Sequence, residues 1–175
     1  KLREDCARYN TPDVETIKPA APPKVSRSSG GVIVEGFDNC LVKFAKCCNP
    51  VPGDEIIGFV TRGGGVAVHR RNCSNVEKNI EKEPGRWLNA SWAVRDGEVY
   101  KAVLSLMTAP NANLFNTISQ LLASENLFTE GILLTGKTDK GDEYEVVVRV
   151  GSNQQLKGLI SKLSIIPGVL WVKRI

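Results

Sequence analysis

The sequence predicts an α+β protein in which two small units follow a linker. Three observations carry this prediction: residues 1–30 are rich in proline and serine, residues 47–73 group three cysteines with the only histidine, and residues 96–175 follow the order βαββαβ. That order is typical of the ferredoxin-like fold, a four-stranded antiparallel sheet with two helices on one face. We therefore divide the chain into a flexible linker (1–30), a small metal-binding α+β domain (31–95) and a ferredoxin-like domain (96–175).

In the linker, prolines and small polar residues leave too few apolar side chains to bury a core. In residues 31–95, short apolar runs alternate with turn residues, which predicts strands joined by tight turns. We expect strands over residues 32–36, 56–61, 66–69 and 87–94, with Arg62 to Gly65 as a hairpin loop. A short helix should begin near Asn72 or Ser74 and run through Ile80, before Pro84 and Gly85.

The second unit has longer elements. Its apolar residues alternate along the expected strands and recur at helical spacing from Asn113 to Glu125 and around Leu156 to Leu163. We expect strands over residues 99–107, 132–137, 144–150 and 169–172.

The thiols and the histidine are the strongest candidates for a binding site. Three thiolates and a neutral imidazole form a complete tetrahedral ligand set for zinc, so Cys47, Cys48, His69 and Cys73 are candidate metal ligands. Adjacent side chains of a strand point to opposite faces, so the first two cysteines can share one ion only if the backbone bends there. Asn49-Pro50 can supply that bend. The His-x3-Cys spacing predicts that His69 and Cys73 lie on one face of a helical turn.

Two other interpretations of the thiols stay open. Buried reduced cysteines are common in protein cores, and the adjacent pair departs from the usual C-x2-C spacing of zinc sites. A catalytic Cys–His pair would need an orienting group and an oxyanion site, and the sequence indicates neither. Cys40 lies in a strand-like context and is expected in the core, and Cys6 falls in the linker.

Basic residues flank the thiols: Lys43, Lys46, Arg62, Arg70 and Arg71. A solvated face is one interpretation, and contact with RNA phosphates is the other. The net charge of +4 alone does not indicate a nucleic-acid partner, because nucleic-acid-binding domains are more basic and more clustered.

The sequence predicts neither secretion nor membrane insertion. No apolar run of about 18 residues is present, the chain opens without the apolar core of a signal peptide, and its five cysteines are an odd number. We expect a cytoplasmic protein with reduced thiols. The missing initial methionine suggests a fragment of a longer chain.

The motif around the thiols resembles a known family. Cys47-Cys48-Asn49-Pro50-Val51-Pro52-Gly53-Asp54, followed by Gly58-Phe59-Val60-Thr61-Arg62-Gly63 and by Val66-Ala67-Val68-His69-Arg70 to Cys73, resembles the zinc-finger, or conserved-cysteine, domain of the Rel/SpoT family. Those enzymes make and hydrolyse (p)ppGpp and are GTP pyrophosphokinases. The βαββαβ unit resembles the ACT domain that ends the same proteins, so the resemblance covers residues 31–175.

The resemblance implies a regulatory segment of a stringent-response enzyme, with zinc as its metal. The family's catalytic domains are absent, so no catalytic residue is assigned here. The segment would couple the sensing of the ribosome and of uncharged tRNA, together with self-association, to those domains. The implied partners are ribosomal RNA, A-site tRNA, a second copy in a homodimer and the catalytic domains of the full-length protein. Whether the parent protein makes alarmone, degrades it or does both is not decided by the sequence.

Two alternatives come from other classes. One is an ACT module that binds an amino-acid effector and dimerises, and the other is a purely architectural dimerisation segment. ACT domains that bind amino acids usually carry an Asp-Arg-x-Gly-Leu turn. The corresponding loop here, Pro110-Asn111-Ala112-Asn113-Leu114, lacks the acid, the arginine and the glycine.

Overall fold

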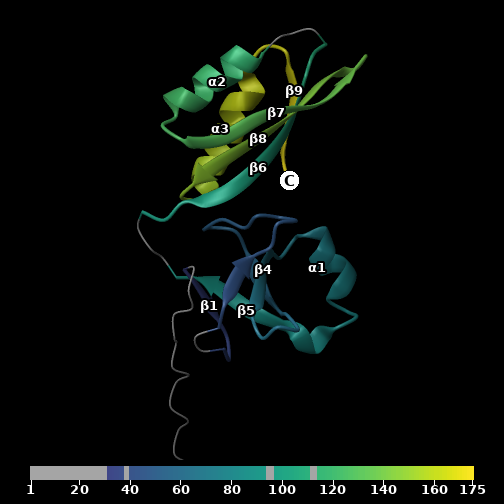
Figure 1. Cartoon of the computed structure of the whole chain (residues 1–175), viewed down its shortest axis with the longest axis vertical. Coiled ribbons are helices and arrows are strands. Elements are labelled where there is room, and N and C mark those ends of the chain that lie inside the picture. Colours follow the sequence, from purple (N-terminus) through teal and green to yellow (C-terminus); the bar gives the residue numbers. More distant parts are fainter. Residues whose placement is uncertain (1–30, 38–39, 94–96, 111–113) are drawn as a thin grey trace, which may run out of the picture.

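The computed structural model describes residues 31–37, 40–93, 97–110 and 114–175. The predicted linker, residues 1–30, lies outside this part of the chain. The described residues form two sheets that follow one another in the sequence, one built from residues 32–92 and one from residues 100–174 (Figure 1). The mixed α+β class predicted from the sequence is therefore confirmed.

The first sheet has five short strands in the order β1-β5-β3-β4-β2. Its strands are β1 (Val32–Val34), β2 (Val42–Phe44), β3 (Ile56–Val60), β4 (Val66–Arg70) and β5 (Trp87–Trp92). All pairs are antiparallel except β2 with β4, which is parallel. A six-residue helix α1 (Ser74–Asn79) and a 3-10 turn (Pro84–Arg86) connect β4 to β5, close to where the turn signals predicted them.

The two faces of this sheet have different roles. Val42 lies opposite Val66 and Phe44 opposite Val68, so these side chains share one face and enter one core cluster. The alternating residues of β4 point the other way, where Ile57 lies opposite His69. On that second face a separate cluster joins Ile57, Cys48, Cys73 and Val76 of α1. The sheet thus separates an apolar core from the cysteine site.

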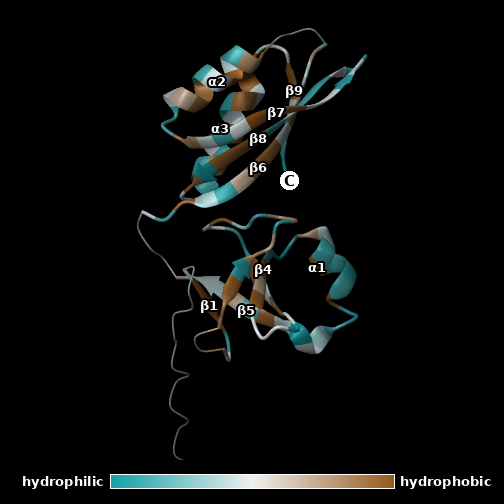
Figure 2. Cartoon of the chain, in the orientation of Figure 1, coloured by the Kyte–Doolittle hydropathy of each residue, from teal (hydrophilic) through white to brown (hydrophobic). Residues whose placement is uncertain are grey.

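The second sheet has the order β7-β8-β6-β9, all antiparallel. Its elements are β6 (Tyr100–Thr108), α2 (Phe115–Ser124), β7 (Phe128–Thr138), β8 (Gly141–Val150), α3 (Asn153–Ile165) and β9 (Val169–Arg174). Both helices cover one face of the sheet, and the core between them consists of inward-facing residues of β6 and β8 with the apolar stripes of α2 and α3 (Figure 2). This is the predicted ferredoxin-like plan.

Three strands of this sheet, β7, β8 and β9, are longer than predicted, and β7 differs most. β7 begins at Phe128, whereas alternation in the sequence predicts its start at Ile132. A bulge shifts the register between Thr129 and Gly131, so the apolar–polar alternation is interrupted there and does not reveal the first residues of the strand.

The segment from Asn49 to Asp54, which we call the proline turn, belongs to the first half of the chain and packs against the second sheet. Its Val51 is fully buried in the core of the second sheet. Beside it, Phe44 stacks on Trp92 with ring centroids 5.7 Å apart, and both rings contact the edge of Tyr100. Aromatic side chains from both halves therefore pack against one another.

Polar interactions reinforce this junction. The Arg174 guanidinium donates to both carboxylate oxygens of Asp54, at 2.9 and 2.7 Å, and to the carbonyl oxygen of Asn49 at 2.7 Å. The backbone N–H of Asn153 donates to the carbonyl oxygen of Pro52 at 2.7 Å. The last strand and the start of α3 are thus tied to the turn that follows the adjacent cysteines.

Within the described residues, none of the helices has the length and apolar character needed to cross a bilayer.

Candidate metal centre

The four predicted ligands come from three elements of the first sheet. Cys47 and Cys48 lie in the turn after β2, His69 is near the end of β4, and Cys73 is the residue that precedes α1. The prediction that His69 and Cys73 share a helical turn is wrong. His69 is in an extended strand, and the turn at Arg71 and Asn72 brings Cys73 back beside it, because the strand continues through residue 70 before the chain reverses.

The bend that lets two adjacent cysteines face one point is present. The backbone N–H groups of Cys48 and Asn49 both donate to the carbonyl oxygen of Ala45, at 3.3 and 2.9 Å. Asn49 has φ +39°, in the left-handed region that asparagine tolerates better than most residues. The bend therefore begins at Ala45, earlier than the Asn49-Pro50 step that predicted it.

The ligand atoms are close enough to hold one ion. All four lie within 4.8 Å of one another. Cys47 Sγ is 3.4 Å from His69 Nδ1, 3.6 Å from Cys73 Sγ and 4.0 Å from Cys48 Sγ, and Cys48 Sγ is 3.9 Å from His69 Nδ1. Tetrahedral zinc with ordinary bond lengths would give S···S separations of about 3.8 Å and S···N separations of about 3.6 Å. The residues therefore fit a tetrahedral metal ion.

Burial and hydrogen bonds shift the pKa values of three of these groups. Desolvation by burial raises the pKa of the Cys48 thiol to about 12, even though the backbone N–H of Arg70 donates to its sulfur at 3.3 Å. Burial also lowers the pKa of His69, which favours the neutral imidazole that can ligate a metal. For Cys73 burial raises the pKa, but hydrogen bonds outweigh it, first from the backbone N–H of Asn75 and then from the two neighbouring thiols, so the net pKa is lowered.

This arrangement has the ligand set of a structural metal site. With a metal bound, the four protein ligands would fill a tetrahedral site and leave no position for substrate or water, as in structural zinc sites. Among the described residues, no carboxylate joins the group, and Trp87 packs its ring against that of His69 with centroids 5.9 Å apart. Cys40 is buried in the other core cluster, as predicted for a core residue.

The five predicted basic residues do not form one surface. Lys43 lies opposite Ala67 and therefore shares the face of His69, whereas Arg70 lies opposite Ile56 on the other face. Lys46 is exposed in the cysteine turn and Arg62 in the hairpin loop. Arg70 and the exposed Arg71 border a cavity at the junction of the two sheets.

The predicted effector loop is described only at its ends. Pro110 is exposed, and Leu114 packs against the core of the second sheet. Asn111, Ala112 and Asn113 lie outside the described residues.

Comparison with known proteins places the chain in a family. Residues 32–93, which include all four candidate ligands, match the family model of the RelA/SpoT RIS domain. A bifunctional (p)ppGpp synthase/hydrolase RelA of Mycobacterium tuberculosis is 34% identical over 166 residues, covering 92% of this chain and 22% of that protein. GTP pyrophosphokinases of Streptomyces coelicolor and Escherichia coli are 30% and 28% identical, covering 92% and 97% of this chain.

The chain spans 20% and 24% of the length of the Streptomyces and Escherichia proteins. Among solved structures, the ACT domain from GTP pyrophosphokinase of Chlorobium tepidum resembles part of the chain with 20% identity and a TM-score of 0.40, covering 45% of this chain and all of that domain.

These findings identify a regulatory segment with a RIS domain and a ferredoxin-like unit. The chain is a C-terminal regulatory region of the Rel/SpoT type.

Proposed function

We propose that this segment binds one zinc ion and couples ribosome sensing to catalytic domains carried elsewhere in a (p)ppGpp-metabolising parent protein. The observation that carries the proposal is the four-ligand centre inside the region that matches the RIS domain. A sheet this small buries a limited core, so a metal that ties three of its elements together supports its fold. Reduced thiols are required for this role, which fits a cytoplasmic location.

In this proposal the segment itself catalyses nothing. The centre has no open coordination position, and the parent's synthetase or hydrolase activity, as in the relatives, belongs to parts that the chain does not span. The segment contributes by binding ribosomal RNA and A-site tRNA and by coupling that binding to the activity of the catalytic domains.

Self-association is the second part of the proposal. β7 is an edge strand of its sheet, and its Phe128 and Leu133 are 66% and 63% exposed. An exposed edge with large apolar side chains is a natural place for pairing with a second chain. These features support a homodimer that pairs through β7.

RNA attachment is proposed to use charge near the centre. Lys43, Lys46 and Arg62 present exposed cations on or beside the elements that carry the ligands. We assign Arg70 and Arg71 to the same interface, and because they border a cavity they are tested separately.

Ribosome binding at several salt concentrations tests the assignment. Replacing Lys43, Lys46 and Arg62 with alanine should weaken binding and lower the salt slope by about one for each phosphate that is no longer bound. The matched control replaces Lys137, Lys140 and Lys173, which removes equal charge from the other sheet. Equal weakening by both triple variants would show a general charge effect and contradict the assignment.

The alternative of an amino-acid effector predicts saturable binding of a branched-chain amino acid. Because the loop lacks the acid, arginine and glycine of effector-binding ACT domains, we expect no saturable heat when valine, leucine or isoleucine is titrated into the chain. A clear binding isotherm would favour the effector module.

A further inference from the structure

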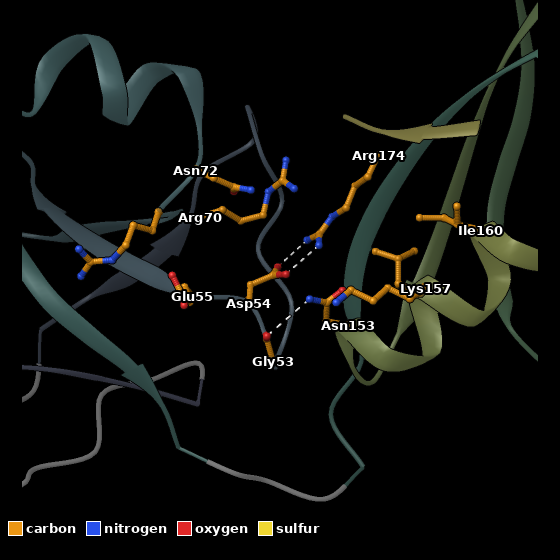
Figure 3. A pocket seen from close by; sticks show the side chains of 11 residues that line it. Gly53, Asp54, Glu55, Arg70, Asn72, Asn153, Lys157, Ile160 and Arg174 are labelled. Atoms are coloured by element: carbon orange, nitrogen blue, oxygen red, sulfur yellow. Dashed lines mark hydrogen bonds and ion pairs between the residues drawn. The ribbon is translucent and has the colours of Figure 1, made fainter. Parts of the chain in front are cut away.

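A cavity of about 580 Å³ lies at the junction of the two sheets. One wall is the end of β4 with the turn that follows it and the proline turn, and the other is the start of α3 with the end of β9 (Figure 3). Its size is that of ordinary small-molecule sites. It lies apart from the metal centre, because Arg70 shares the sheet face opposite to that of His69.

Two arginines reach the cavity from opposite walls, Arg70 from the first sheet and Arg174 from the second (Figure 3). Each has a buried Nε without a hydrogen-bond partner, and among the described residues these are the two buried side-chain polar atoms in that condition. The Arg174 side chain is only 9% exposed, and its other nitrogens are occupied by Asp54 and by the carbonyl oxygen of Asn49. Buried donors are normally satisfied, so both arginines at this cavity have hydrogen-bonding capacity that the protein itself does not use.

The charge around the cavity favours an anion. Arg70, Arg71, Lys157 and Arg174 line it, against the carboxylates of Asp54 and Glu55. Asp54 and Arg174 neutralise each other through their paired hydrogen bonds. Arg70, Arg71 and Lys157 then remain against Glu55, which leaves an excess of positive charge. The first turn of α3 borders the same space, and the positive end of a helix dipole adds to the field.

The lining also has an apolar part. Ile160 of α3 is partly buried and lines the cavity, and the fully buried Leu156 lies one turn before it. A ligand that matches both the charged and the apolar lining has an anionic group for the basic side chains and an apolar body for this wall.

We propose that this cavity binds a small organic anion carrying a phosphate or carboxylate group, and that the anion bridges the two sheets. Guanidinium groups bind both oxyanions through short, charge-assisted hydrogen bonds. Because Arg70 and Lys157 come from different halves of the chain, an anion bound by both would stabilise the packing of the two sheets. The site shares Arg70 and Arg71 with the proposed RNA interface, but the binding of a small anion does not depend on RNA binding.

Calorimetric titration of the zinc-loaded chain with phenyl phosphate and with phthalate tests the proposal. The two probes share one ring and differ in the oxyanion. Saturable binding of phenyl phosphate alone identifies a phosphate site, of phthalate alone a carboxylate site, and of both a general oxyanion site. Phenol at the same concentrations is the neutral control, and ionic strength is held constant with sodium chloride.

The decisive variant is Arg70→Gln, which keeps a polar side chain and leaves the Arg174–Asp54 pair intact. It should weaken probe binding by about tenfold or more, the scale expected when one charge-assisted hydrogen bond is removed. Lys140→Gln removes one positive charge from the exposed turn between β7 and β8, outside both proposed sites, and should leave probe affinity unchanged. Zinc content and the unfolding midpoint without probe report whether each variant is folded.

Absence of saturable binding for both probes overturns the proposal. Equal weakening of probe binding in Lys140→Gln and Arg70→Gln, or unchanged probe affinity in a folded Arg70→Gln, also overturns it. If Arg70→Gln lowers ribosome affinity but not probe affinity, Arg70 belongs to the RNA interface and the anion site is wrong.

Discussion

Among single residues, Cys48 shows most clearly what a bound metal would change at this centre. Its side chain is fully buried, and burial raises its pKa to about 12, above the ordinary 9.0 of a thiol. Without a cation the folded protein therefore favours the protonated thiol. A bound divalent ion inverts this preference, because a coordinating thiol loses its proton outright.

The first prediction concerns pH. As pH rises, the metal-free protein should lose stability, whereas the affinity for zinc should increase. In the metal-free protein, the raised Cys48 pKa contributes stability that is present below about pH 9 and is lost as pH rises toward about 12. Zinc binding must displace at least this proton, so the apparent zinc affinity should rise at least about tenfold per pH unit between about pH 6 and 8. Competition titrations at three pH values measure the affinity, and a flat pH profile would contradict the assignment of Cys48 as a ligand.

At the scale of elements, the proline turn is the feature that connects the centre to the second sheet. Cys48 is followed within three residues by Val51, which is buried in the other core. Trp92 adds a hydrogen bond from its indole N–H to the carbonyl oxygen of Asp54 at 2.9 Å. A displacement of the cysteines would therefore be felt at the junction.

The second prediction concerns Gly53 in this turn. It has φ +95°, and a Cβ there would lie 3.3 Å from Asn153 Cβ of α3. Gly53→Ala should destabilise the chain by about 1 kcal/mol from backbone conformation alone, with a further loss from the close approach to Asn153. Gly64→Ala is the matched control, since Gly64 has φ +77° and open space around it. Chemical denaturation gives both values, and equal losses would mean that the approach to α3 costs nothing.

The helices, strands and turns also show which features could be predicted from the sequence and which could not. Val66 to His69 and the strands of the second sheet were predictable, because alternation reports local burial. The four ligands were predictable from residue type and spacing. The His69–Cys73 conformation was not, because the same spacing fits either a helical turn or a strand followed by a reversal. The ion pair between Arg174 and Asp54 joins residues 120 positions apart, and no local pattern reports such a pair.

At the scale of the whole molecule, the two sheets are joined by a buried ion pair. The side chains of Arg174 and Asp54 are 9% and 7% exposed. Removing one partner of a buried pair leaves the other charge uncompensated, which is strongly destabilising. The pair therefore stabilises the packing of the two sheets against each other.

The third prediction is that Asp54→Ala uncouples the two sheets. We expect a loss of about 3–5 kcal/mol and two separate transitions in thermal unfolding where the unchanged chain shows one. Glu125→Ala is the control, because its pair with Lys162 is far more exposed, at 26% and 51%, and such pairs contribute about 0–1 kcal/mol. A single transition in Asp54→Ala with a small loss would show that apolar packing alone holds the junction.

Elemental analysis of the purified chain tests directly whether the four ligands hold a zinc ion. We predict about one zinc per chain, lost in Cys48→Ser and in His69→Ala and retained in Cys40→Ser, which changes a buried thiol outside the centre. A folded, metal-free chain, or equal zinc content in Cys48→Ser and Cys40→Ser, would contradict the account and leave the centre as a cluster of buried thiols.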